Sequence, residues 1–308
     1  MNLTFATRPS ELARWQTAFV MRALEAAHPG LTCREQVFVT RGDRTLDRAL
    51  PQIGGKGLFT QELEAALLDG RADAAVHSLK DLPTINPDGL TLGAIPARAD
   101  ARDALVSAAG YTIESLPQGA RVGTSSPRRR AQILRQRPDL QVADIRGNVD
   151  TRLRKLFDGQ YDAILLAVAG LTRLGLDARL GEQMQPFSFE QMLPAPGQGA
   201  LAVQCRAADP EILPILQAIE DPATRLAVTA ERAFLAGLGG GCAVPIAAHA
   251  QVTVSSESAP RIQLAGLVAA PDGHAVIRMH GEGAEPDALG QHLAEEALNR
   301  GAQALLQA

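Results

Sequence analysis

The sequence predicts an α/β fold with mostly parallel sheets, followed by a smaller α+β domain. In the first two-thirds of the 308 residues, short apolar stretches alternate with stretches of helical period. Strands that alternate with helices form parallel sheets through right-handed crossovers. Near residue 220 the pattern changes to three consecutive strand-like segments between two helical ones. That order is typical of an antiparallel sheet covered by helices.

The first α/β segment contains the clearest local signals. Ser10 is expected to cap a helix, and a second helix over 58–68 is expected to turn Leu63 and Leu67 inward and to end at Gly70. Strands are expected at 3–6, 36–40, 74–77 and 90–95. The expected inner face of the first helix consists of Leu12, Trp15, Phe19, Ala23 and Ala26.

The rest of the chain is read in the same way. Helices are expected at 126–137, 148–157, 224–238 and 286–306. A strand is expected to end at 122–123, and further strands are expected at 140–145, 162–168, 201–204, 247–254, 262–268 and 275–279. Candidate boundaries lie at 96–100, 194–199 and 221–222.

Composition excludes several classes of protein. The net charge of −4 argues against a general nucleic-acid binder, which needs a basic surface. We see no run of 18 apolar residues and no signal-peptide pattern, so we expect neither a membrane span nor secretion. Cys33, Cys205 and Cys242 are too few and too scattered for a disulfide framework or a metal site, which favours a reducing cytoplasm.

Two predicted helix starts carry clustered arginines. Ser126 is the expected cap of the first, Pro127 fits its first position, and Arg128, Arg129 and Arg130 follow in its first turn. Cations there oppose the helix dipole by about 0.3–1 kcal/mol each, whereas a bound anion reverses the sign. Arg146 and Arg152 flank the next helix start in the same way. The pattern indicates a pocket for carboxylates or phosphates, to which Arg8 would add a cation; a solvated basic turn is the alternative.

Three further segments are candidates for chemistry. The glycine-rich loop 54–59 lacks Walker A spacing, which leaves a mobile loop with Lys56 and Phe59 as contacts, or a plain surface loop. Lys80-Asp81 follows a strand, where the carboxylate is an acid/base candidate or half of a surface ion pair. Gly239-Gly240-Gly241-Cys242 presents a thiol on an irregular loop, which favours covalent attachment or nucleophilic work over an incidental thiol.

Taken together, these segments resemble the porphobilinogen deaminase family along nearly the whole chain. The resemblance rests on Val39-Thr40-Arg41-Gly42-Asp43 and on residues 6–8, 54–59, 76–83, 123–129, 165–171, 197–200 and 239–245. It implies two lobes like those of type 2 periplasmic binding proteins and a third domain that carries the cysteine. The implied boundaries are 1–97 with 197–217, then 98–196, then 218–308.

The resemblance also implies an activity in porphyrin and heme biosynthesis. The family condenses four porphobilinogen molecules head to tail, releases ammonia at each step, and hydrolyses the product from a dipyrromethane cofactor. It implies a thioether to Cys242 and a catalytic role for Asp81 in amine loss and in stabilising the cationic azafulvene. Implied cofactor contacts are Lys80, Asp81, Ser126, Arg128, Arg129 and Arg146; implied substrate contacts are Arg8, Ser10, Arg146, Arg152, Arg173 and Gln198; Lys56 and Phe59 belong to the mobile loop.

Further expectations follow from this family. The protein should be a cytoplasmic monomer that binds no metal, no nucleic acid and no membrane. Pro127 replaces an aliphatic residue common in the family, and the first helical position tolerates it. Two other functional classes stay open: a two-lobed binding protein or sensor for a small polycarboxylate, and an enzyme that uses Cys242 as an ordinary nucleophile.

Overall fold

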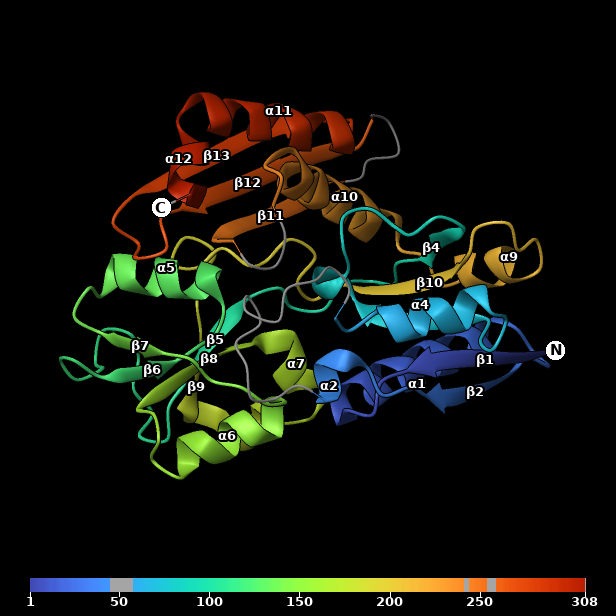
Figure 1. The fold of residues 1–308 in the computed structure, drawn as a ribbon, viewed down its shortest axis with the longest axis horizontal. Helices are drawn as coiled ribbons and strands as arrows, with labels where there is room; N and C mark the ends of the chain where they lie inside the picture. Colours follow the sequence, from blue (N-terminus) through green and yellow to red (C-terminus); the bar gives the residue numbers. More distant parts are fainter. Residues whose placement is uncertain (45–57, 241–243, 254–258, 308) are drawn as a thin grey trace.

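The computed structural model describes residues 1–44, 58–240, 244–253 and 259–307. Within these residues, three sheets divide the molecule into two lobes and a C-terminal domain, which lie around a common centre (Figure 1). The predicted α/β fold with a smaller α+β domain is confirmed. No helix in the described ranges is both long and apolar enough to cross a membrane.

Lobe 1 is built on a five-stranded sheet of order β2-β1-β3-β10-β4. The strands β1 (Asn2–Thr7), β2 (Thr32–Val37) and β3 (Ala74–Ser78) are parallel, and β10 (Leu201–Arg206) runs antiparallel between β3 and β4 (Leu90–Ala94). Its helices are α1 (Glu11–Ala27), α2 (Arg41–Arg44), α4 (Gln61–Leu68), the 3-10 turn η1 (Leu79–Asp81) and α9 (Ile212–Gln217).

Lobe 2 repeats this plan with the sheet order β7-β6-β8-β5-β9. The strands β6 (Arg121–Gly123), β7 (Gln141–Ala143) and β8 (Ala163–Ala167) are parallel. The sequence did not predict β5 (Asp103–Val106) or β9 (Met184–Pro186); β5 runs antiparallel between β8 and the edge strand β9. Its helices are α5 (Pro127–Gln136), α6 (Val149–Phe157), α7 (Val168–Arg173), α8 (Asp177–Leu180) and the 3-10 turn η2 (Gly181–Gln183).

The C-terminal domain packs two helices on an antiparallel meander. The strands β11 (Ile246–Thr253), β12 (Arg261–Ala269) and β13 (Val276–Gly283) pair in order, and α10 (Pro222–Gly237) and α11 (Pro286–Asn299) lie together against them. The single helix predicted over 286–306 is broken, because Gly301 adopts a φ of +91° and α12 (Ala302–Gln307) starts after it.

The predicted inner face of α1 is wrong. The buried side chains are Ala13, Gln16, Thr17, Val20 and Leu24, whereas Phe19 is 37% exposed. Gln16 donates to Ser78 Oγ (2.9 Å) and Thr17 to Thr7 Oγ1 (2.8 Å), so these polar groups are buried with partners. Trp15 and Phe19 instead stack on each other, with ring centroids 5.5 Å apart.

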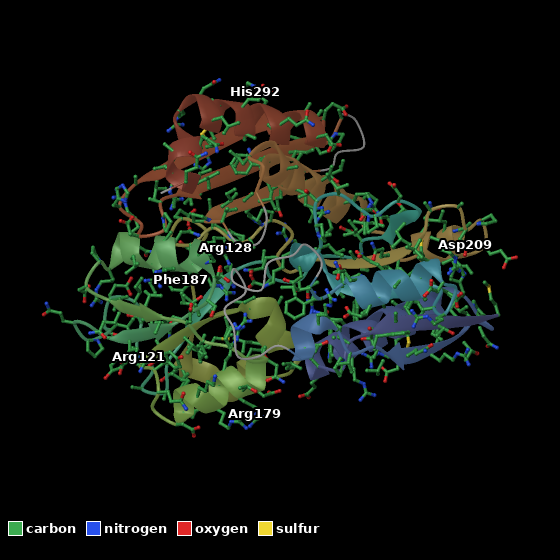
Figure 2. The ribbon with its side chains drawn as sticks, in the orientation of Figure 1. Arg121, Arg128, Arg179, Phe187, Asp209 and His292 are labelled. Atoms are coloured by element: carbon green, nitrogen blue, oxygen red, sulfur yellow. The ribbon has the colours of Figure 1, made fainter. Side chains whose placement is uncertain are left out.

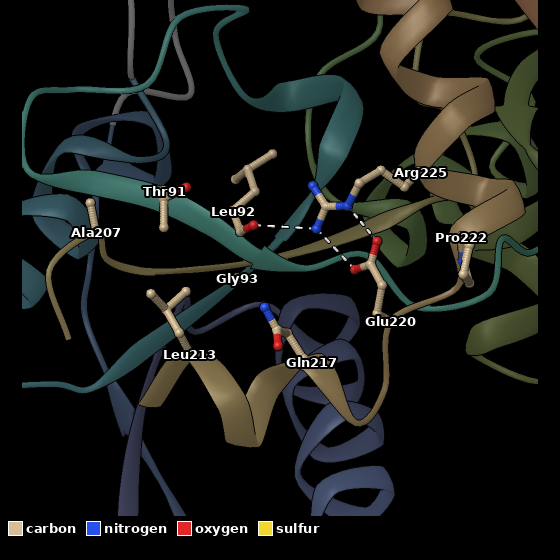
Figure 3. A pocket seen from close by; sticks show the side chains of 9 residues that line it. All are labelled: Thr91, Leu92, Gly93, Ala207, Leu213, Gln217, Glu220, Pro222 and Arg225. Carbon is tan, nitrogen blue, oxygen red and sulfur yellow. Dashed lines mark hydrogen bonds and ion pairs between the residues drawn. The ribbon is translucent and has the colours of Figure 1, made fainter. Parts of the chain in front are cut away.

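A pocket of about 670 Å³ opens where β4, α9 and the start of α10 meet (Figure 3). Its basic residue Arg225 is paired with Glu220 and donates to the Leu92 carbonyl oxygen (3.3 Å). This pocket is separate from the centre of the molecule. In Figure 2, Arg128 lies at that centre, whereas Arg121 and Arg179 lie at the periphery of lobe 2.

The C-terminal domain is joined to both inter-lobe segments by one buried carboxylate. Glu231, on α10, is fully buried and accepts from Arg98 at 2.6 and 3.1 Å. It also accepts from the backbone N–H of Gly197 (2.7 Å) and of Ala250 (2.8 Å). Arg98 and Gly197 belong to the two stretches of chain between the lobes. Burial alone would raise the pKa of Glu231, but Arg98 and His249 lower it to about 2.

Replacement of Glu231 by Gln should destabilise the fold strongly. The change leaves the Arg98 charge buried without its carboxylate, which costs about 3–5 kcal/mol of unfolding free energy. Because the pKa of Glu231 is depressed from 4.5 to about 2, its contribution is present above pH 4.5 and disappears as the pH falls through this window. Urea unfolding at pH 7 and at pH 3 measures both effects.

Glu282→Gln is the matched control for this prediction. Glu282 pairs with Arg261, but both side chains are exposed at the surface of the meander. An exposed pair contributes about 0–1 kcal/mol. Equal losses in the two variants would contradict the role assigned to Glu231.

Candidate active site

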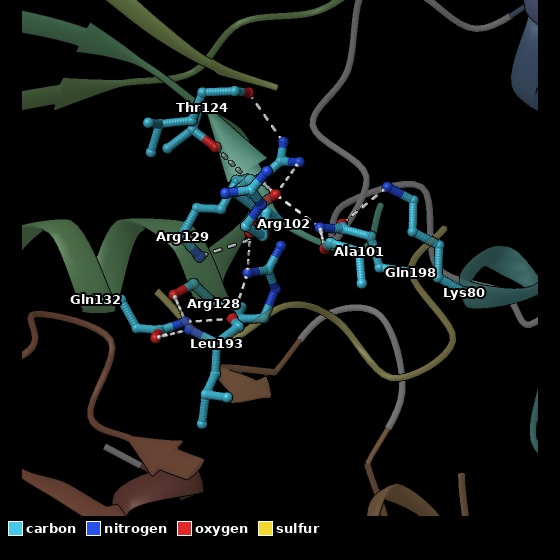
Figure 4. A network of polar contacts seen from close by, with 12 residues as sticks. Lys80, Ala101, Arg102, Thr124, Arg128, Arg129, Gln132, Leu193 and Gln198 are labelled. Atoms are coloured by element: carbon cyan, nitrogen blue, oxygen red, sulfur yellow. Dashed lines mark hydrogen bonds and ion pairs between the residues drawn. The ribbon is translucent and has the colours of Figure 1, made fainter. Parts of the chain in front are cut away.

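A buried carboxylate organises the region between the lobes. Asp103, the first residue of β5, is fully buried and accepts from Arg128 Nη1 (2.6 Å), Arg129 Nη2 (2.6 Å) and Arg129 Nε (2.9 Å). Figure 4 draws the polar network around Arg128, Arg129 and Gln198. Burial alone would raise the pKa of Asp103, but the two guanidinium charges hold it well below its ordinary value.

The helix α5 presents both arginines to this carboxylate. Ser126 Oγ accepts from the Arg129 N–H (3.4 Å) and Pro127 occupies the first turn, so the predicted cap is confirmed. Arg128 is 4% exposed and Arg129 6%, and they also donate to the carbonyl oxygens of Leu193 (2.7 Å) and Leu165 (2.9 Å). Asp103 therefore offsets part of these charges without a bound anion, and the sequence did not predict this partner.

Gln198 connects this carboxylate to lobe 1. Its Nε2 donates to Asp103 Oδ1 (2.9 Å) and to the Ala101 carbonyl oxygen (2.7 Å), and its Oε1 accepts from Lys80 Nζ (3.2 Å). Its own carbonyl oxygen accepts from Arg98 Nε (2.8 Å). The fully buried Gln198 thus has partners at both ends of its amide, and it lies between the lobes rather than at a surface.

Lys80 and Asp81 follow β3 directly, at its carboxyl end. Burial first, together with the charges of Arg129 and Arg128, lowers the pKa of the half-buried Lys80 to about 8, while Asp81 and Asp103 act in the opposite direction. Lys80 is therefore mostly protonated at pH 7. Within the described ranges, Asp81 is exposed and accepts no hydrogen bond, so its carboxylate can meet a ligand.

Lobe 2 adds two more cations after β7. Asn148 caps α6 by accepting from the Thr151 N–H (2.9 Å), as predicted, and α6 presents Arg152 in its first turn. Arg152 Nε donates to the Gly147 carbonyl oxygen (2.9 Å). Burial first, then the charges of Arg129 and Arg146, lower the pKa of Arg152 to about 10, while Asp81 acts in the opposite direction.

The structure therefore brings seven charged groups together. Five are basic and two are acidic, so the cluster carries excess positive charge; its members are Lys80, Asp81, Asp103, Arg128, Arg129, Arg146 and Arg152. Arginines that depress one another's pKa are stabilised by an added anion. Guanidinium forks match carboxylate geometry, so this cluster, which we call the arginine cluster, is suited to a ligand with several carboxylates.

Other predicted contacts have local partners. Arg8 Nη2 pairs with Asp43 Oδ1 (2.5 Å), and the Phe59 ring lies 4.2 Å from the Arg8 guanidinium carbon. Ser10 Oγ accepts from the Ala13 N–H (3.3 Å) as a helix cap, so this predicted cap is confirmed. Arg173, on α7, donates to the carbonyl oxygen of Gly199 (2.7 Å).

Two of the predicted site residues, Lys56 and Cys242, lie outside the described residues. Among the described cysteines, burial raises the pKa of both Cys33 and Cys205 to about 11, which suits inert thiols. His77 is buried, and burial lowers its pKa to about 4, so it stays neutral beside Gln204.

Asp103 is the main residue that sequence reasoning missed. It stands 25 positions before Arg128 at the start of a four-residue strand that the sequence did not predict. The available signal was the pair of arginines itself, because two arginines on a buried helix turn require a carboxylate partner.

Comparison with known proteins places this chain among porphobilinogen deaminases. Residues 3–214 match the family model described as porphobilinogen deaminase, dipyromethane cofactor binding domain, and residues 225–299 match the C-terminal domain of the same family. A porphobilinogen deaminase of Roseiflexus castenholzii is 53% identical over 99% of this chain and 98% of its own length. That of Brevibacillus brevis is 51% identical over 96% and 94%.

Two solved structures share the fold at lower sequence identity. The VFT2 domain of Bordetella pertussis BvgS has a TM-score of 0.42 and 15% identity over 71% of this chain and 86% of its own. An ancestral arginine-binding protein has a TM-score of 0.38 and 15% identity over 71% and 90%. Likenesses of this level support no inference about the site.

Replacement of Asp103 by Asn should collapse the arginine cluster. The amide has nearly the volume of the carboxylate but leaves two buried guanidinium groups without a counter-charge. We expect a loss of about 3–5 kcal/mol in the free energy of unfolding. Chemical denaturation measures it, with Asp139→Asn as the control, since Asp139 pairs with Arg137 near the surface. A loss below about 1 kcal/mol for Asp103→Asn would contradict the central place of this carboxylate.

Proposed function

Because this chain belongs to the porphobilinogen deaminase family, we propose that the arginine cluster holds the carboxylates of its cofactor and its growing product beside Asp81. The activity is that of a hydroxymethylbilane synthase, a transferase of tetrapyrrole biosynthesis. Four porphobilinogen molecules are joined head to tail, and one ammonia leaves at each addition. The alternative of a two-lobed polycarboxylate sensor is not favoured by a match that covers both parts of the family.

One observation supports this assignment of the site most directly. The arginine cluster has five basic groups against two carboxylates, and burial of Arg152 beside Arg129 and Arg146 lowers the pKa of Arg152 to about 10. Each pyrrole unit bears an acetate and a propionate, so a chain of pyrroles is a polyanion. Binding of such a chain would offset the excess charge, and guanidinium forks would fix its orientation.

The residues of the cluster fit a dipyrromethane. We assign Lys80, Arg128, Arg129 and Arg146 to its carboxylates, with Ser126 at the start of α5, and we assign the thioether to Cys242. When bound, this group supplies the pyrrole carbon to which the first substrate unit is joined. A permanent tether keeps the growing chain at one site, so that each addition is effectively intramolecular.

Substrate would enter beside the same cluster. Arg152 has one described bond, from Nε to a carbonyl oxygen, which leaves its terminal nitrogens for a carboxylate. Arg8 would contribute from lobe 1 after exchanging its bond to Asp43, and Phe59 and Lys56 would cover the entrance. Arg173 and Gln198 would act between the lobes, and Ser10 at the start of α1.

Asp81 is assigned the proton chemistry. Each addition breaks the bond between the aminomethyl carbon and nitrogen, releases ammonia, forms one carbon–carbon bond and removes one proton from a pyrrole carbon. The Asp81 carboxylate is exposed at the end of η1, beside Lys80, and can hold the proton of the leaving amine and the pyrrole N–H groups.

We further propose that the protein is a cytoplasmic monomer that binds neither nucleic acid nor a membrane. We propose that residues 1–97 with 197–217 form lobe 1, residues 98–196 form lobe 2, and residues 218–308 form the C-terminal domain.

The intact mass tests the cofactor. We expect purified protein to exceed the polypeptide mass by two condensed pyrrole units, and Cys242→Ala to lack this excess. Cys33→Ala is the matched control, because Cys33 is half-buried on β2 with a pKa raised to about 11 and should not react. Active protein with an unmodified mass would refute the covalent cofactor.

Asp81→Asn tests the catalytic group. The amide cannot take up the proton, so turnover of porphobilinogen should fall by about 10²–10⁴-fold, the range for loss of a general acid or base. The mass excess should remain, since attachment is assigned to Cys242. Asp88→Asn, at an exposed position of the same loop, should keep full turnover. Wild-type turnover in Asp81→Asn would remove Asp81 from the mechanism.

A further inference from the structure

The turn between β12 and β13 lies directly on α5. Gly273, in this turn, is buried and has a φ of +76°. A Cβ atom built on Gly273 would meet the Ala131 carbonyl oxygen at 2.3 Å and the Arg135 backbone nitrogen at 2.8 Å. Both atoms are backbone of α5, so neither can rotate away. The turn can approach the helix this closely only because residue 273 has no side chain.

Other contacts hold the same surfaces together. Arg135 Nη1, on α5, donates to the His274 carbonyl oxygen in the turn (3.1 Å). Ala131 is fully buried in a cluster with Ala247, Leu267 and Ala269 of β11 and β12. The C-terminal domain therefore contacts the outer side of α5 with apolar and polar groups, and Figure 1 shows the β12–β13 turn reaching this helix.

The opposite side of α5 faces the interior of lobe 2. Ile133 is fully buried in the lobe 2 core, together with Leu105 and Leu165 of its sheet. The side chain of Gln132 exchanges bonds with the backbone of Leu193, accepting from its N–H (2.8 Å) and donating to its carbonyl oxygen (2.9 Å). The helix α5 is therefore packed between the C-terminal domain and the core of lobe 2. A substitution that adds volume on either side must shift α5 or disrupt one of these packed contacts.

The first turn of the same helix carries Arg128 and Arg129 of the arginine cluster. Gly273 lies one helical turn further along, against Ala131 and Arg135. From this geometry we infer that Gly273 is a positioning residue: by seating the β12–β13 turn on α5, it fixes the two arginines at the distance that the carboxylates of the growing chain require. This inference rests on the proposed function of the cluster.

The size of the expected effect follows from the contact distance. Ordinary contacts of a Cβ atom begin near 3.4 Å, so an added methyl group at residue 273 must separate the turn and α5 by about 1 Å. A displacement of about 1 Å in a substrate-positioning group can cost about 10²-fold in rate. Arg128 and Arg129 are assigned to the carboxylates of the cofactor on which the chain grows, and they transfer no proton. Their displacement moves the acceptor pyrrole away from the incoming substrate, so the change should appear mainly as a raised KM.

The chain offers a matched control. Gly159, which follows α6 in lobe 2, has a φ of +75°, and a Cβ atom built there meets nothing within 4 Å. Gly159→Ala and Gly273→Ala therefore introduce the same backbone strain, and only Gly273→Ala adds pressure on α5. A purely structural effect would lower the active fraction in either variant without changing KM for porphobilinogen.

The experiment compares KM, kcat and cofactor content by intact mass in wild type and both variants. We expect Gly273→Ala to raise KM for porphobilinogen by about 10- to 100-fold with the cofactor retained, and Gly159→Ala to leave KM within about twofold. An unchanged KM in Gly273→Ala would overturn the inference. Failure of the proposed function is a different result, since wild-type protein would then not turn over porphobilinogen at all.

A second variant decides the question if Gly273→Ala does not fold. Arg135→Gln removes the bond to the turn without adding volume, and should raise KM about two- to fivefold, as expected for loss of one hydrogen bond. Arg137→Gln is its control, because the bonds of Arg137 stay within lobe 2, on Ile113, Leu116, Pro117 and Asp139. If Arg135→Gln and Arg137→Gln have the same KM as wild type, the turn does not position the arginines.

Discussion

The site depends on one electrostatic constraint: two arginine side chains are buried in the first turn of a helix. Neither charge is tolerated there alone, since burial and the helix dipole both oppose it. Asp103 resolves this by accepting from both guanidinium groups while it is fully buried itself. The carboxylate offsets only part of the positive charge in the arginine cluster. We propose that the remaining positive charge binds the carboxylates of the ligand.

In the same region, one neutral amide and one charged carboxylate join the two lobes and the C-terminal domain. Gln198 links Lys80 of lobe 1 to Asp103 of lobe 2 through an amide with distinct donor and acceptor ends. Glu231 links Arg98 and Gly197 to α10 through a charge. The contacts that fix the domains are thus adjacent to the cations to which we assign ligand binding. Arg98 contacts both Glu231 and Gln198, so the C-terminal domain is connected to the arginine cluster through two side chains.

Local signals in the sequence predicted much of the fold. The helix caps Ser10, Ser126 and Asn148 act as expected, because a cap bond joins residues only three positions apart. The strand β5 was missed because it has four residues, starts with a charge, and pairs with β8 about sixty positions later. The inner face of α1 was wrong for a related reason: Gln16 and Thr17 are buried by hydrogen bonds to Ser78 and Thr7, which hydrophobic periodicity does not reveal. The arginine positions of the site were predictable as a motif, whereas their counter-ion depended on that missed strand.

The position of β10 bears on how the polypeptide acquires its structure during synthesis. Residues 201–206 form the strand between β3 and β4, so the lobe that begins at the N-terminus lacks an inner strand until two-thirds of the protein has been made. Until then β3 presents an unpaired edge. The sheet of lobe 2, drawn from residues 103–186, is complete in one continuous stretch and has no such delay. During synthesis, all strands of the lobe 2 sheet are therefore present before the sheet of lobe 1 is complete. The incomplete sheet of lobe 1 is then the part that nascent-chain chaperones would need to cover.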